Sequence, residues 1–271
     1  REVSGVAETT GATPEAILAQ LSDIAERVLA RCKAKGASQA EVGLNQDRGL
    51  AVNVRMGEVE TLEYTHDRGL SLTVFFDQRK GSASTADLDP ASIETTIEQA
   101  CAIARYTEAD PYAGLADAER MATKFPDLDQ WHPWEINADE AIDIALRCEQ
   151  AGRDLDPRIS NSDGASLSSG RSLSVYANSH GFIGRERGSS HSLSCALIAG
   201  RDEAMQRDYW YTASCHPDEL QDAATVGRRA AERAIARLQP GAVQTGRYPV
   251  LFAPEVARSL FGHLLSAVSG S

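Results

Sequence analysis

The nine residues Leu50–Glu58, LAVNVRMGE, decide the fold class of this chain. Leu50, Val52 and Val54 alternate with Ala51, Asn53 and Arg55, and this period of two predicts a strand with one buried face. The turn residues that follow, Met56-Gly57-Glu58, predict a tight reversal into a second strand that continues through Leu62 and Tyr64. Short reversals pair strands antiparallel, so the stretch favours an antiparallel sheet.

Further strands are predicted on both sides of a long central segment. Asp67-Arg68-Gly69 resembles another turn, and the residues after it alternate again up to Phe76. Later in the chain the pattern resumes at Leu173, turns at 178–181 and continues through Leu197. Tyr209 and Tyr211 indicate one more strand, and Tyr248–Phe252 a short one.

Helices are predicted before and after each block of strands. Thr13-Pro14 and Asp89-Pro90 each place a capping side chain before a helix that opens on proline. Asn137 with Glu140 forms a capping box that opens a third helix, and the apolar spacing over 218–238 predicts a fourth. The residues from Pro254 onward have helical spacing as well.

The order of elements is helix, antiparallel strands, helix, and then the same again, which predicts an α+β fold. An Arg-Gly pair occurs in each strand block, at Arg68-Gly69 and Arg187-Gly188, and suggests a structural duplication. We expect a first α+β unit over 1–125, a second over 126–242, and the start of a mostly β C-terminal domain over 243–271. The rest of that domain is expected to be absent from this chain.

Composition narrows the range of functions. The 271 residues carry a formal net charge of -12, which argues against nucleic acid and anionic membranes as partners. No apolar run approaches the ~18 residues of a membrane span. The five cysteines are widely spaced without a C-x-x-C pair, which is typical of reduced thiols in a cytoplasmic protein.

Known catalytic motifs are missing from the sequence. There is no G-x-S-x-G, Walker or G-x-G-x-x-G pattern, and the serine-rich stretch 162–174 has no base at a useful spacing. His191, between Ser190 and Ser192, is interpreted as a partly exposed strand residue, with substrate contact as the alternative. Arg207, Tyr209 and Tyr211 are candidates for a substrate groove or a subunit interface, and ordinary sheet packing is the competing interpretation.

An ordered set of segments resembles the PmbA branch of the TldD/PmbA metallopeptidase family. The segments are Arg79-Lys80-Gly81-Ser82-Ala83-Ser84, Ala104-Arg105-Tyr106-Thr107, Pro126-Asp127-Leu128-Asp129, Asn178-Ser179-His180-Gly181, Arg207-Asp208-Tyr209 and Phe261-Gly262-His263-Leu264. Each is weak alone, but they occur in order over most of the chain. The resemblance implies an N-terminal α+β domain, a mostly β C-terminal domain, and a dimer of related cytoplasmic subunits associated with peptide maturation and proteolysis.

In the TldD branch of that family, a helix with the pattern H-E-x-x-x-H binds zinc. The corresponding stretch here is His263-Leu264-Leu265-Ser266-Ala267-Val268. Leu264 stands in the glutamate position and Val268 in the position of the second histidine, and neither side chain can bind zinc or move a proton. His263 falls on the apolar side of the predicted helix, which favours a buried, hydrogen-bonded histidine. We therefore expect no catalytic residue, cofactor or metal in this chain, and zinc in a TldD-type partner.

Two functions follow as hypotheses. The first is the zinc-free, PmbA-type (TldE-type) subunit of a heteromeric metallopeptidase, which contributes to peptide processing or degradation without catalytic residues of its own. The second is a self-associating regulatory or binding protein with no proteolytic role.

Overall fold

The computed structural model describes residues 12–269, so the start of the predicted first unit lies outside the described residues. The chain divides into a large compact unit that ends at Leu238 and a small unit that begins at Gln239. The large unit contains α1 (Pro14–Ala34), β1 (Gln39–Arg55), β2 (Glu58–Phe76), β3 (Arg79–Thr85), α2 (Pro90–Tyr106), α3 (Ala138–Arg153), β4 (Ile159–Asn178), β5 (Ile183–Ala199), β6 (Gln206–Ser214) and α4 (Ala223–Ala236). Three single-turn 3-10 helices lie between them, and the small unit contains α5 (Pro254–Val268).

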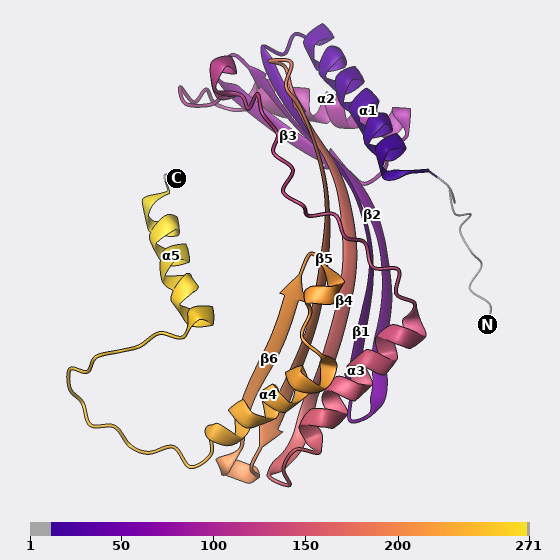
Figure 1. Ribbon diagram of the computed structural model, residues 1–271. Helices are drawn as coiled ribbons and strands as arrows, with labels where there is room; N and C mark the ends of the chain where they lie inside the picture. Colours follow the sequence, from indigo (N-terminus) through magenta and orange to yellow (C-terminus); the bar gives the residue numbers. More distant parts are fainter. Residues whose placement is uncertain (1–11, 270–271) are drawn as a thin grey trace. The chain divides into compact units, whose positions relative to one another are not determined.

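The six strands of the described residues form one antiparallel sheet, in the order β3-β2-β1-β4-β5-β6. The predicted α+β class with antiparallel strands is confirmed. The two strand blocks do not form separate sheets, because β1 of the first block pairs with β4 of the second along most of its length. Figure 1 shows these long, curved strands passing from one pair of helices to the other.

The predicted helix starts are confirmed at three positions. The Thr13 hydroxyl accepts from the Ala16 amide, and the Asp89 carboxylate accepts from two amides of the first turn of α2. Asn137 and Glu140 form the complete capping box of α3. These local contacts satisfy amides that have no partner inside the helix, which is why short sequence patterns predict them.

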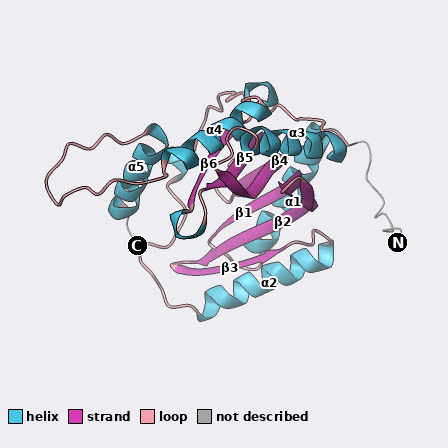
Figure 2. Cartoon of the chain, turned by 90° about the horizontal axis from the view of Figure 1, so that it is seen from below, coloured by secondary structure: helices cyan, strands magenta, loops and turns pink. Residues whose placement is uncertain are grey.

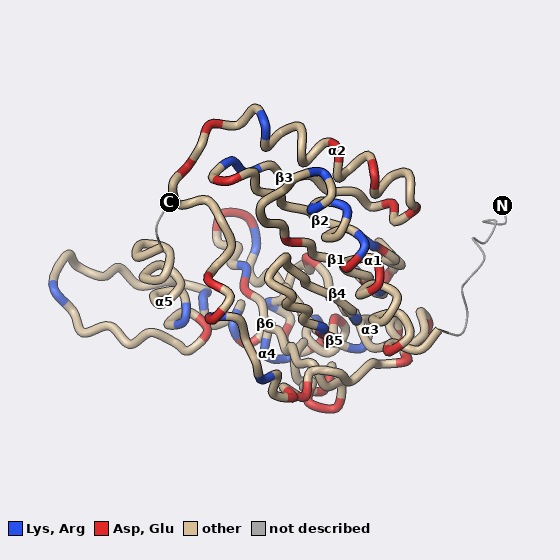
Figure 3. The backbone as a smooth tube through the Cα atoms, turned by 90° about the horizontal axis from the view of Figure 1, so that it is seen from above, with Lys and Arg blue, Asp and Glu red and all other residues tan. Residues whose placement is uncertain are grey.

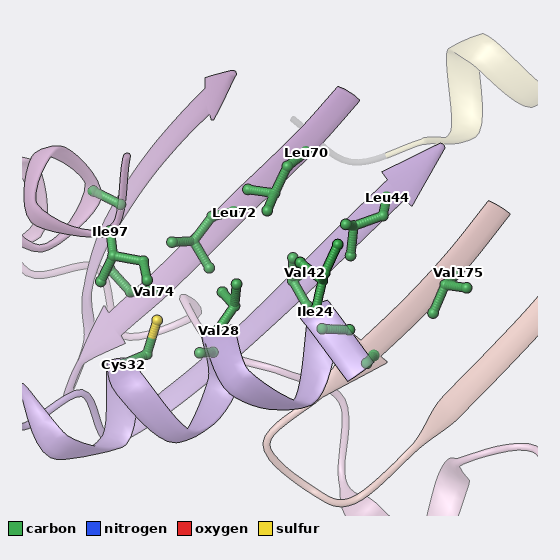
Figure 4. Packing of buried hydrophobic residues seen from close by; sticks show 14 of the residues in the cluster. Ile24, Val28, Cys32, Val42, Leu44, Leu70, Leu72, Val74, Ile97 and Val175 are labelled. Atoms are coloured by element: carbon green, nitrogen blue, oxygen red, sulfur yellow. The ribbon is translucent and has the colours of Figure 1, made fainter. Parts of the chain in front are cut away.

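Alternate residues on the same face of β1 and β4 contribute to both cores, so helices α1 to α4 cover one face of the sheet. Figure 2 shows α2 beside β3, and α3 and α4 beside β4 to β6. Side chains that alternate inward from β1, β2 and the end of β4 pack against α1 and α2 to form the first core (Figure 4). Val28, Val42 and Leu72 are among its fully buried members. Cys32 lies in the same core, and burial raises the pKa of its thiol to about 12, so this thiol has the role of a small core side chain.

A second core lies under α3 and α4, formed by the other halves of β1 and β4 together with β5. The positions of the two cores correspond. Five buried residues of the first core each lie the same number of positions before a buried residue of the second core. The pairs are Val42 and Ala165, Leu44 and Leu167, Leu70 and Leu193, Leu72 and Cys195, and Val74 and Leu197. The same helix–strand–helix pattern is therefore built twice around the β1–β4 pair.

Three local predictions are wrong. Asp67-Arg68-Gly69 is no turn but lies in the middle of β2. The fourth helix begins at Ala223, capped by Asp222, and ends at Ala236, so it is shorter than 218–238. Tyr248–Phe252 is not a strand, although the helix predicted from Pro254 is present. The predicted turn at 56–58 is confirmed at Met56-Gly57, and the turn at 178–181 is confirmed as well. The predicted unit boundaries at 125 and 242 stay predictions.

Acidic and basic residues are interspersed along the described chain (Figure 3). Within residues 12–269, no helix combines the length and the apolar character that a membrane crossing requires.

Candidate functional site

The centre of the sheet is polar, between the two apolar cores. Here β1 and β4 pair Arg48 with Arg171 and Gly49 with Gly170. Because successive side chains of a strand point to opposite faces, the two arginines share the helix-covered face and the two glycines share the open face. One cavity lies beside the two arginines on the helix-covered face of the sheet, and another lies beside the two glycines on the open face.

The cavity on the helix-covered side has a volume of about 360 Å³. Arg48, Arg171 and Ser169 form part of its floor, and β2 contributes Tyr64, Thr65 and His66. Residues 133–136 of the segment before α3 close the cavity from above. Trp131 packs against the first core and Trp134 against the second. Residues 131–136 therefore bridge the polar gap between the two cores, and we call them the bridging segment.

A buried hydrogen-bonded chain holds that bridging segment on the sheet. The Ser169 hydroxyl lies 2.9 Å from His191 Nδ1, and His191 Nε2 lies 2.9 Å from the backbone oxygen of His132. Since a carbonyl only accepts, Nε2 carries the proton, and in the neutral ring Nδ1 accepts from Ser169. The rings of Trp134 and His191 meet edge to face at 90°, with centroids 5.6 Å apart. The arrangement satisfies every polar atom of the imidazole.

The predicted partial exposure of His191 is wrong, because the side chain is 1% exposed. Its pairing with Ser169 was also missed, because the two residues are 22 positions apart and meet only through the register of β4 and β5. Only a correct prediction of the β4–β5 register would have revealed the contact between Ser169 and His191. Ser169 and Trp134, which both contact His191, line the cavity, whereas His191 does not. The predicted substrate contact of His191 stays a prediction.

His132 of the bridging segment contacts His216, which lies far from it in the sequence. The rings of His132 and His216 lie in contact, with centroids 4.4 Å apart and planes tilted by 36°. His132 Nε2 lies 3.1 Å from a carboxylate oxygen of Asp129, while the ring of His216 accepts from the Asp218 amide. Among residues 12–269, no three His, Cys, Asp or Glu side chains are placed to hold a metal ion. The ring contact joins the segment before α3 to the loop that follows β6.

The cavity on the open face has a volume of about 540 Å³ and a lining of small residues. Gly49, Gly170 and Gly188 leave its floor without side chains, and Thr65, Ser168, Ser172 and Ser190 surround them with hydroxyl groups. A floor of this kind offers hydrogen bonds and room for an approaching chain. Asp47 adds one carboxylate to the lining of this cavity.

The other three predicted contact residues lie on β6, the edge strand of the sheet. Arg207 forms an ion pair with Asp163. Tyr209 is half exposed, and its ring stacks on that of Tyr211 at 6.3 Å. These residues line neither central cavity, so the structure separates them from Ser169 and the two arginines. Their assignment to a groove or an interface stays a prediction.

The residues that correspond to the zinc-binding pattern H-E-x-x-x-H are His263, Leu264 and Val268. They lie on α5, in the small unit. No residue of α5 is buried, and Leu264 and Val268 are 58% and 70% exposed. His263 is exposed too, so the prediction of a buried histidine is wrong for this chain. Leu264 and Val268 offer no ligand atoms, and the position does not fit a zinc ion.

Comparison with known proteins gives the family. The family model "PmbA/TldA metallopeptidase domain 1" matches residues 40–104, and "PmbA/TldA metallopeptidase central domain" matches residues 131–238. The chain belongs to the PmbA/TldD metallopeptidase family. The matches to these family domains cover β1 to α2 and then the bridging segment to α4, so the Arg48–Arg171 row joins the two family domains.

Relatives place the chain in the PmbA branch of that family. It is 45% identical to "Metalloprotease PmbA" of Escherichia coli O157:H7 over 85% of this chain and 51% of that protein. It is 41% identical to "Metalloprotease PmbA homolog" of Haemophilus influenzae over 87% and 52%. The chain therefore spans about half the length of these curated relatives. A crystal structure of a putative modulator of DNA gyrase from Bacteroides thetaiotaomicron matches with a TM-score of 0.83 and 26% identity, over 91% of this chain and 56% of that one.

Proposed function

We propose that this chain belongs to the zinc-free, PmbA-type subunit of a heteromeric cytoplasmic metallopeptidase that processes or degrades peptides. In this proposal the catalytic zinc is held by a TldD-type partner subunit. Membership of the PmbA branch supports the link to proteolysis.

The assignment of a zinc-free role rests on one observation, the side chains that occupy the positions of the H-E-x-x-x-H pattern. A zinc site needs nitrogen, sulfur or oxygen ligands, and a hydrolytic site also needs a base for the metal-bound water. His263 is a possible ligand, but Leu264 and Val268 supply neither a second ligand nor a base. A single imidazole does not hold a catalytic zinc ion.

The apolar surface of α5 supports association with other protein surfaces. Leu260, Leu264, Leu265 and Val268 are all about half exposed or more. Burying one such side chain is worth roughly 1.5–3 kcal/mol, which provides a driving force for covering this helix. In our proposal the covering surface lies within the assembled peptidase, and the task of this subunit is to complete and stabilise the substrate channel of its partner.

The zinc content of the protein tests this assignment. We expect elemental analysis of the full-length protein, purified without a TldD-type partner, to find far less than one zinc per subunit. The TldD-type partner, purified in the same buffers, is the positive control. About one zinc per subunit of this protein, lost in a His263→Ala variant, would show that the motif still binds metal and would refute the assignment.

A further inference from the structure

We infer that the cavity on the helix-covered side of the sheet is a binding site for a carboxylate group, held between Arg48 and Arg171. The inference goes beyond the proposed function and does not depend on it. It rests on the geometry of the arginine row, on one unpaired nitrogen and on the balance of charge in the cavity.

The arginine row places like charges next to each other. Arg48 and Arg171 are direct cross-strand partners. Like charges directly opposite each other destabilise an antiparallel pair. Two guanidinium groups in this position suit an anion that bridges them, because a guanidinium binds a carboxylate through two parallel hydrogen bonds.

The two arginines differ in their partners. Arg171 donates to Glu135 at 3.0 Å. Arg48 forms no ion pair within residues 12–269, and its Nε is buried without a hydrogen-bond partner. A buried donor without an acceptor costs roughly 1–3 kcal/mol, so an acceptor supplied by a ligand would recover that cost.

The charges that line the cavity select a monoanion. Two arginines and one carboxylate, that of Glu135, leave one positive charge in excess. A carboxylate neutralises this excess, whereas a phosphate dianion would face Glu135 with surplus negative charge. The volume of about 360 Å³ and the aromatic side chains of Tyr64 and Trp134 fit a ligand of amino-acid size.

Binding of small carboxylates to the full-length protein tests the site, measured by ligand-observed NMR titration. The probes are N-acetylglycine, which carries a main-chain carboxylate, and N-acetylaspartate α-methylamide, which carries only a side-chain carboxylate. Neutral N-acetylglycinamide and inorganic phosphate complete the set. We expect saturable binding of at least one carboxylate probe, and weaker binding of the amide and of phosphate. The stronger of the two carboxylates identifies the source of the group.

Three variants with a matched control test the residues. Arg48→Gln and Arg171→Gln should each weaken carboxylate binding about tenfold or more, because each removes a charged donor. Arg48→Lys keeps the charge but loses the paired donors, and should weaken binding less than Arg48→Gln. Arg68→Gln, at an exposed arginine of β2 outside the cavity, should leave binding unchanged.

We expect Arg48→Gln to fold, because it removes one of two opposed positive charges, and a thermal melt checks this. Three results would overturn the inference: no saturable carboxylate binding, equal or tighter binding of the amide or of phosphate, or unchanged carboxylate binding in the folded arginine variants. If Arg48→Gln fails to fold, carboxylate binding by the Arg48→Lys and Arg171→Gln variants still tests the inference.

Discussion

Replacing Gly227 with alanine is expected to lower the free energy of unfolding by about 3 kcal/mol or more. A Cβ atom at this position of α4 would lie 1.8 Å from the backbone oxygen of Cys148 in α3. The two helices cross here with their backbones in close approach, since a Cβ at Gly152 would in turn lie 2.5 Å from the oxygen of Gly227. Alanine favours a helix over glycine by only about 1 kcal/mol, so the clash dominates.

Urea unfolding of the full-length protein measures this effect, with Arg228→Ala as the control. Arg228 is the next residue of α4 and is exposed, so its replacement should change stability by no more than about 0.5 kcal/mol. A Gly227→Ala protein as stable as the control would show that α3 and α4 do not pack as closely as described.

Replacing Glu149 with alanine is expected to cost about 3–5 kcal/mol. The Glu149 carboxylate is 1% exposed and accepts hydrogen bonds from the amides of Met56 and Gly57, both at 2.8 Å. Both turn residues have positive φ, 54° and 83°, as a two-residue β-hairpin turn requires. The carboxylate therefore fixes the β1–β2 turn to α3, and its loss leaves two amides without their acceptor.

Two further variants of α3 sharpen this test in the same unfolding experiment. Glu149→Gln keeps one acceptor oxygen and should lose about half as much stability. Asp143→Ala removes an exposed partner of Arg147 and should change stability by less than about 0.5 kcal/mol. A loss below 1 kcal/mol in Glu149→Ala would contradict the described role of this carboxylate.

Features set by neighbours in the sequence could be predicted. The caps at Thr13, Asp89 and Asn137 depend on residues within one helical turn, and all three were predicted correctly. The turn predicted at Asp67-Arg68-Gly69 failed because Gly69 has a different role. A Cβ there would lie 2.9 Å from Asn45 Oδ1 on β1, so glycine permits a close cross-strand contact inside β2.

The candidate site could not be predicted, because it depends on contacts between distant parts of the chain. Arg48 and Arg171 meet only when β1 pairs with β4, and no local pattern indicates that register. His191 and Ser169 meet through the register of β4 and β5. The predicted strand at Tyr248–Phe252 is rich in apolar and aromatic residues. A strand also needs a neighbour for its backbone hydrogen bonds, and residue composition does not provide one.

Peptide hydrolysis tests the central proposal most directly. The assay compares the full-length protein, a TldD-type subunit and the mixture of both, each with and without a metal chelator. We expect no hydrolysis by this protein alone and strong hydrolysis by the mixture that the chelator abolishes. Hydrolysis by the TldD-type subunit that is the same with and without this protein would favour a separate regulatory role. Substantial hydrolysis by this protein alone, unaffected by the chelator, would contradict the proposal.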